Sequence, residues 1–199
     1  MAGKRNSGVP DGKPIKRFTS QADWAAWLNR HHATSGGLWL KIAKKTSGAA
    51  SVSYAEALDV ALCYGWIDGQ KQPCDDSWWL QKFTPRGPRS IWSKINRGKV
   101  KVLTKAGRMK PPGLREVGRA KRDGRWVGAY DSFKSAVVPD DLQAALDRNR
   151  KAKAFFPTLS AGNRYAILFR VQTAKRAETR ARRIREYVAM LERHETIHP

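Results

Sequence analysis

The sequence predicts an α+β fold, with a small mixed N-terminal domain around a short antiparallel sheet and an all-helical C-terminal unit. Three observations predict it. Apolar residues recur three and four positions apart in several segments, as helices require. Short apolar runs typical of strands occur between residues 38 and 83. From Asp140 to the end, the pattern is helical throughout.

The composition divides the chain into three parts. Residues 1–16 are basic and carry almost no apolar side chain, so we expect a flexible basic tail there. A mixed domain is expected at 17–130, because eight Trp and 41% hydrophobic residues can supply a core. A three-helix unit is expected at 138–196.

The first elements follow from caps and spacing. Ser20 is expected to cap a helix, after which a buried strand is expected at 38–42. Either Ser51 or Ser53 begins a second helix, which ends at Gly65.

A hairpin is expected next. Two strand-like runs at 66–71 and 77–83 are separated by the turn-forming residues Pro73, Asp75 and Asp76. These runs predict the antiparallel part of the sheet.

The following helix is expected to begin at the cap Ser90 and to reach about Thr104. Its apolar face would consist of Ile91, Ile95 and Val102.

Four more helices complete the prediction. Pro111 opens a short one that ends at about Arg122. In the C-terminal unit, helices are expected to start at Asp140, at Ser160 and near Ala174.

The charge is large and uneven. The net charge is +22, from 39 Lys and Arg against 17 Asp and Glu. Residues 85–126 hold fourteen cations and two acids, and residues 148–185 hold twelve cations and one acid, whereas 53–79 is acidic. Such an excess normally has a negatively charged partner, so nucleic acid or another polyanion is expected. A solvated basic surface without a partner is the alternative.

An anion site is predicted in the first basic block. Arg86 and Arg89 stand just before the helix expected at Ser90, where the free N–H groups and the helix dipole also favour an anion. The alternative is that these arginines pair with Asp68 or with the acids of the hairpin turn. The candidate anion-binding residues are Arg86, Arg89, Ser90, Lys94, Arg97, Lys101, Lys121 and Arg125.

The last helix offers a second basic track. Its cations surround the apolar stripe on almost every other side, which suits a polyanion, although a solvated helix with an Arg182–Glu186 pair explains the same pattern. The candidates are Lys175, Arg176, Arg180, Arg182, Arg183 and Arg185.

Four segments resemble a known family. They read ALCYGWIDG (61–69), FTPR (83–86), SIWSKIN (90–96) and AKRDGRW (120–126). In combination they resemble the bacterial YdeI/OmpD-associated, or bacteriocin-protection, family, and the helical end resembles the C-terminal domain of that family. The resemblance implies a role in stress or antimicrobial-peptide resistance and association with a porin, and it brings no established reaction.

An enzyme is the second class of function considered. Asp68 stands in an apolar stretch, where a buried carboxylate could act as an acid or a base, although a turn or ion-pair role is more usual. Cys63 falls at a helix C-terminus, where a reactive thiolate is not favoured. Trp66, Trp92 and Trp126 are the other candidates to line such a pocket, and Trp92 could instead stack a base or fill the core.

A protein-interaction module is the third class, with Trp78 and Trp79 as anchors. The sequence shows no phosphate-binding loop, dinucleotide fingerprint or metal signature, so we expect no cofactor and no metal. Two Cys, no secretory signal and no apolar stretch of membrane-spanning length lead us to expect a cytoplasmic protein without a membrane span.

Overall fold

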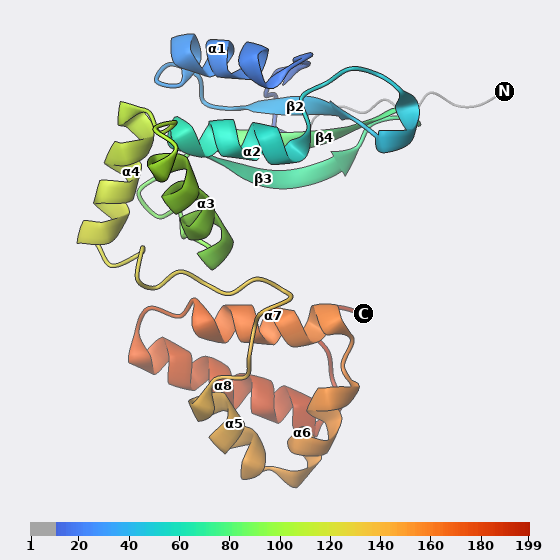
Figure 1. Ribbon diagram of the computed structural model, residues 1–199. Coiled ribbons are helices and arrows are strands. Elements are labelled where there is room, and N and C mark those ends of the chain that lie inside the picture. The colour runs from blue at the N-terminus through green and yellow to red at the C-terminus, as the bar shows by residue number, and fades with distance from the viewer. Residues whose placement is uncertain (1–10) are drawn as a thin grey trace, which may run out of the picture. The chain divides into compact units, whose positions relative to one another are not determined.

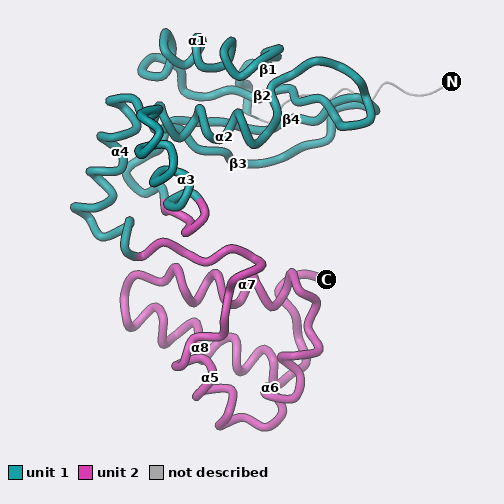
Figure 2. The backbone as a smooth tube through the Cα atoms, viewed as in Figure 1, with its two compact units in different colours: residues 1–90, 96–127 teal, residues 91–95, 128–199 magenta. Residues whose placement is uncertain are grey.

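The computed structural model of the protein describes residues 11–199, in which four strands and two α-helices occupy the chain up to residue 85 and helices follow (Figure 1). This confirms the predicted α+β class. The chain divides into two units. The first comprises the residues up to 90 together with 96–127, and the second comprises 91–95 together with 128–199 (Figure 2).

The segment 91–95 belongs to the second unit because it pairs with residues near Tyr130. The Tyr130 N–H donates to the Trp92 carbonyl at 3.0 Å, and the Lys94 N–H donates to the Tyr130 carbonyl at 2.8 Å. Backbone bonds therefore join residues that lie 36 and 38 positions apart in the chain.

The sheet of the first unit has the strand order β1 (Ile15–Lys16), β2 (Leu38–Ala43), β4 (Trp78–Pro85) and β3 (Trp66–Pro73). β1 runs parallel to β2, and the other neighbours are antiparallel. The predicted hairpin of β3 and β4 is thus confirmed. Its turn is closed by Asp75, whose carboxylate accepts the N–H groups of Ser77 and Trp78 at 2.9 and 2.8 Å.

The predicted flexible tail needs a correction in its second half. Residues 1–10 lie outside the described residues, but 11–16 are held on the sheet. The Asp11 carboxylate pairs with Lys82 at 2.6 Å and accepts the Trp39 Nε1–H at 2.9 Å. These bonds, from Lys82 first and then Trp39, lower the pKa of Asp11 to about 2. One carboxylate and two backbone pairs therefore order a segment with little apolar surface of its own.

Helices α1 (Gln21–His31) and α2 (Tyr54–Cys63) each begin with a capping box. Ser20 and Asp23 form the first, as the cap at Ser20 predicts. Ser53 caps α2 together with Glu56, whereas the hydroxyl of Ser51 accepts the Ala43 N–H. This resolves the alternative between the two serines.

Tryptophans join α1 and α2 to the sheet. The ring of Trp24 lies 6.2 Å from that of Trp66 and 5.8 Å from that of Phe83, and all three side chains are buried. The indole N–H of Trp24 donates to the Ala57 carbonyl on α2, so the polar edge of the ring is satisfied as well. This aromatic cluster therefore packs α1 against α2 and against strands β3 and β4.

Helix α3 (Lys94–Lys105) starts three residues later than a cap at Ser90 predicts. Ser90 does not cap it, because the Ser90 hydroxyl accepts the Gly87 N–H at 2.9 Å within a turn of its own. A polar residue just before an apolar run can close a turn as well as a helix, and here it closes the turn.

The predicted apolar face of α3 is also wrong. Ile95 and Val102 are 53% and 68% exposed, and Ile91 is 37% exposed. The buried side of the helix is formed by Asn96, Val100 and Leu103. Both stripes have helical spacing, so the sequence pattern alone could not choose between them.

Helix α4 (Pro111–Arg122) begins at Pro111 as predicted and packs closely on the end of α2. The Lys110 N–H donates to the Cys63 carbonyl at 3.1 Å. A Cβ atom on Gly113 would lie only 2.3 Å from that same carbonyl oxygen and 2.7 Å from the Leu62 oxygen. The absence of a side chain at Gly113 therefore permits the helix contact.

The second unit contains α5 (Asp140–Asp147), α6 (Arg150–Phe155), α7 (Ala161–Gln172) and α8 (Ala177–Glu192). Residues 138–196 thus hold four α-helices rather than the expected three. The additional one is α6, whose cap is Asn149, with a side-chain oxygen that accepts the Ala152 N–H at 3.0 Å. The buried core of the unit comprises Leu142, Leu146, Ala152, Phe156, Leu159, Ile167, Leu168, Val171, Ile184 and Leu191.

Short 3₁₀ turns occur at Lys45–Ser47 and Phe156–Thr158. Within residues 11–199, none of the helices combines the length and apolar character needed to cross a membrane.

Replacing Gly113 by Ala tests the contact between α2 and α4. We expect the free energy of unfolding to fall by about 1–3 kcal/mol, because backbone atoms must move to admit the methyl group. Gly98→Ala in α3 is the matched control, since a Cβ there would meet nothing within 4 Å. That change should raise stability by about 0.5–1 kcal/mol. Urea unfolding followed by Trp fluorescence measures both, and equal effects would disprove the close approach at Gly113.

Candidate functional site

Two arginines of the first basic block point into the protein rather than toward solvent. The Arg125 side chain is 3% exposed and binds the Asp123 carboxylate through Nε and Nη2, at 2.8 and 2.6 Å. Its Nη1 donates to the Ser90 carbonyl at 2.6 Å. Arg86 is 5% exposed, and its carbonyl accepts a hydrogen bond from Arg119. Of the predicted anion-binding residues, Arg86, Ser90 and Arg125 therefore form contacts within the protein.

Lys94 is engaged in the second unit. Its ammonium lies 2.7 Å from the Asp131 carboxylate, which also accepts the Gln172 side-chain amide at 2.6 Å. Burial raises the pKa of Asp131, but the hydrogen bonds from Lys94 and Gln172 outweigh it and leave the pKa below its ordinary value. Lys94 thus neutralises the buried Asp131 carboxylate, which is hydrogen-bonded to Gln172 of α7.

Arg97 and Lys121 flank the ring of Trp126. The Arg97 guanidinium carbon lies 5.5 Å from the ring centroid and the Lys121 ammonium 5.8 Å from it. Trp126 itself is 9% exposed, so both cations lie over the ring of a core residue. Both cations come from the helices α3 and α4, and Lys121 remains exposed.

Lys99 and Arg119 are half-buried and pair with Asp59 and Glu116, and the other cations of α3, α4 and the connection 106–110 are exposed. Within residues 11–199 no ion pair or hydrogen bond of their side chains is found, and Arg89, just before α3, shares this property. We call these six side chains the α3–α4 basic surface: Lys101, Lys105, Arg108, Lys110, Arg115 and Arg122.

The basic track of α8 divides in the same way. Arg180 binds the Asp141 carboxylate through Nε and Nη2 at 2.5 and 2.7 Å, and its Nη1 donates to the Val171 carbonyl. Arg183 donates to the Arg170 carbonyl. Both thereby satisfy carbonyls at the C-terminal end of α7. The hydrogen bond from Arg180 lowers the pKa of Asp141.

The remaining residues of the track face solvent. Arg182 lies 3.4 Å from Glu186, and both side chains are more than half exposed, so this pair contributes little stability. Lys175, Arg176 and Arg185 are exposed.

The candidates for an enzyme pocket lie mostly in the core. Trp66 and Trp92 are 0% and 1% exposed, and the Trp66 indole donates to the His32 carbonyl. Asp68 lies half-buried on β3 and accepts the Tyr54 hydroxyl at 2.7 Å. Burial raises the pKa of the Cys63 thiol against the opposing effect of Arg108. That direction agrees with the interpretation of Cys63 as an unreactive thiol.

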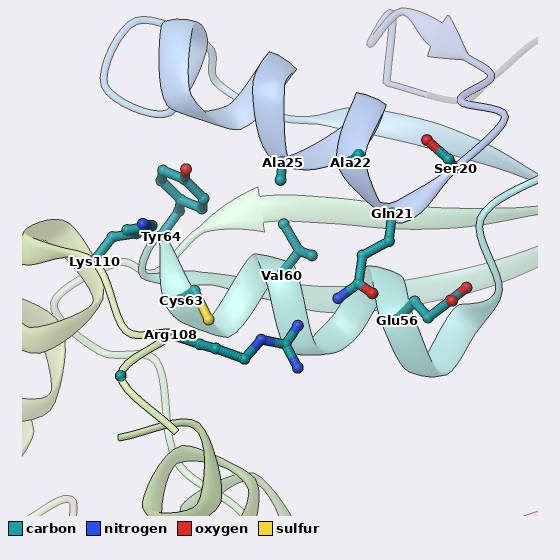
Figure 3. Close-up of a pocket in the computed structure, with 11 residues that line it drawn as sticks. Ser20, Gln21, Ala22, Ala25, Glu56, Val60, Cys63, Tyr64, Arg108 and Lys110 are labelled. Atoms are coloured by element: carbon teal, nitrogen blue, oxygen red, sulfur yellow. The ribbon is translucent and has the colours of Figure 1, made fainter. Parts of the chain in front are cut away.

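A pocket of about 710 Å³ lies beside Cys63, in a place that the sequence did not indicate. Its walls are the first turns of α1, the outer side of α2 and the connection 106–110 (Figure 3). The side chains that define its chemistry are Gln21, Ala25, Glu56, Val60, Arg108 and Lys110.

Residues 16–116 match the family model described as Domain of unknown function (DUF8412), and residues 135–194 match the one described as Bacteriocin-protection, YdeI or OmpD-Associated. The second match confirms the resemblance seen in the sequence, and it falls on α5 to α8. Three of the four motifs that suggested it lie instead within the first match. No curated protein and no solved structure matches the chain. Within the described residues, no cluster of His, Cys, Asp and Glu could hold a metal ion.

The substitution Arg180→Met tests whether this arginine stabilises the second unit. We expect it to lower the free energy of unfolding by about 1 kcal/mol or more, because Asp141 and the Val171 carbonyl lose their donor. Arg185→Met removes the same charge from the exposed side of α8 and should change stability by less than about 0.5 kcal/mol. Urea denaturation measures both. Equal losses would contradict the assignment of Arg180 to the interior network.

Proposed function

The chain belongs to the DUF8412 family over residues 16–116 and carries a YdeI/OmpD-associated domain at 135–194, and we propose that it binds nucleic acid through the α3–α4 basic surface. Neither family description names a reaction. The binding is sequence-tolerant and directed at phosphates. The observation that carries this proposal is the set of six exposed cations without acidic partners within the described chain.

The positive charge of the α3–α4 basic surface remains because few acidic residues lie close enough to neutralise it. Between residues 97 and 122 the only acid is Glu116, and its carboxylate binds Arg119 on the same helix. Lys99 pairs with Asp59 of α2 at 2.7 Å. The other cations of the segment have no such neighbour, and each one that contacts a phosphate would release a counterion.

The exposed apolar residues beside these cations are aliphatic. Val102 is 68% exposed and Leu114 is 46% exposed, and the nearest tryptophan, Trp126, is buried. Stacking of bases needs an exposed aromatic face, which the described residues of α3 and α4 do not offer. Contacts to phosphate and sugar are therefore favoured over contacts to bases.

A protein-interaction module that uses Trp78 and Trp79 has less support. Arg17 lies over the Trp78 ring at 4.7 Å, and Lys71 lies over the Trp79 ring at 4.5 Å. Charged side chains therefore cover the faces that would have to act as apolar anchors.

The same proposal places the protein in the cytoplasm, where nucleic acid is the abundant polyanion. From the description of the C-terminal domain we also propose a role in protection against bacteriocins. Cells that carry a charge-reversed α3–α4 surface should then survive a bacteriocin less well than cells with the natural protein. Equal survival, at equal protein levels, would show that protection does not depend on the α3–α4 basic surface.

Charge reversal at four positions tests the nucleic-acid proposal. The variant Lys101→Glu, Lys105→Glu, Arg115→Glu and Arg122→Glu should weaken binding to a duplex DNA at least about tenfold. Loss of up to four phosphate contacts should reduce the slope of log affinity against log salt by up to about 3.6. Fluorescence anisotropy at several salt concentrations, with duplexes of different sequence, measures both quantities.

The matched control reverses four exposed cations of the other block, with the changes Lys175→Glu, Arg176→Glu, Arg182→Glu and Arg185→Glu. Its net charge equals that of the first variant, but we expect a much smaller loss. Equal losses in the two variants would mean that only the overall charge attracts DNA, and the proposed surface would be rejected.

A further inference from the structure

The pocket beside Cys63 combines an apolar wall with charged ends. Ala25 of α1 and Val60 of α2 line its middle, where a small side chain on α1 leaves the space open. Figure 3 shows Lys110 and Tyr64 at one end, Glu56 at the other, and Arg108 extended between them. The volume of about 710 Å³ lies within the range typical of small-molecule sites.

The cations of the pocket are fixed through their backbone while their side chains stay available. The Arg108 N–H donates to the Leu103 carbonyl at 2.9 Å, and the Lys110 N–H donates to the Cys63 carbonyl at 3.1 Å. Within residues 11–199 neither side chain forms an ion pair. Two positive charges therefore face the pocket from a connection that is itself anchored to α2 and α3.

The opposite end carries a negative charge that is already satisfied. The Glu56 carboxylate accepts the backbone N–H and the hydroxyl of Ser53, at 2.9 and 2.7 Å. The Ser53 N–H first, and then its hydroxyl, lower the pKa of Glu56. Glu56 is therefore ionised at neutral pH and repels a second anionic group at that end.

We propose that this pocket binds a small organic monocarboxylate, with the carboxylate on Arg108, the charge of Lys110 at the adjoining end, and the apolar body against Ala25 and Val60. Arg108 offers a planar fork of donors that matches a carboxylate, and Lys110 adds a point charge. The alanine and valine side chains provide an apolar surface for a short aliphatic or aromatic group. The ligand class follows from the charges at the two ends and the apolar wall between them.

Three probes of equal length distinguish the pocket from nonspecific attraction to a protein of charge +22. They are octanoate, its neutral amide, and the dicarboxylate octanedioate. Nonspecific attraction favours the doubly charged octanedioate, whereas the pocket favours octanoate, because Glu56 lies where the second carboxylate would be. Isothermal titration calorimetry measures the three affinities.

Two variants locate the site. Arg108→Gln should weaken octanoate binding about tenfold, since a charge-assisted hydrogen bond is lost. Ala25→Leu should weaken it by a similar factor, because it fills the apolar middle. Arg30→Gln, at an exposed arginine in the last turn of α1 outside the pocket, is the matched control and should leave the affinity unchanged.

Amide chemical-shift changes on titration should fall on α1, α2 and residues 107–110. Octanoate that binds more tightly than both of its analogues, and responds to Arg108→Gln and Ala25→Leu but not to Arg30→Gln, supports the proposal. No binding at 10 mM (an upper limit of about 10⁻² M for a specific site), equal binding of octanoate and its amide, or tighter binding of octanedioate overturns it. None of these variants is among the charge reversals that test nucleic-acid binding, so either proposal can fail without the other.

Discussion

The scarcity of carboxylates is the constraint that shapes the charged surface of this protein. With 39 cations and 17 acids, most cations have no carboxylate with which to pair. Several of these acids connect elements of the fold. Asp11 pairs with Lys82 of β4, Asp131 binds Gln172 of α7, and Asp141 of α5 pairs with Arg180 of α8. The surplus cations of α3 and α4 remain because those helices contain only one acid between residues 97 and 122.

Local signals in the sequence predicted most of the elements. The caps at Ser20 and Ser160 and the turn before β4 depend on neighbours within four residues, so the sequence contains all that is needed to find them. Helix α3 shows the limit of such signals. Val100 and Leu103 have the spacing of one helical face and Ile95 and Val102 that of another, so the choice between the two faces depends on which side meets the remainder of the first unit. Helix α6 is too short, at six residues, to show a clear period, and only its cap at Asn149 could have indicated it.

The candidate residues were predictable to the extent that their partners are near in sequence. Asp123 stands two positions before Arg125, so the ion pair that removes Arg125 from the surface could have been expected. Arg180 meets Asp141 from 39 positions away, and its role as a donor to the end of α7 depends on the packing of three helices. The pocket beside Cys63 was out of reach for the same reason, because α1, α2 and the connection 106–110 contribute to it from separate parts of the chain.

Arg108 and Lys110 belong both to the α3–α4 basic surface and to the pocket, so the two proposed activities are thermodynamically linked. A carboxylate bound at Arg108 cancels part of the charge that a phosphate backbone would meet on the same connection. Linkage then requires that each ligand lowers the affinity for the other by the same factor. The size of that factor is bounded by geometry: only two of the six surface cations face the pocket, and Lys101, Lys105, Arg115 and Arg122 stay free to hold a polyanion. A small anion should therefore weaken nucleic-acid binding without abolishing it.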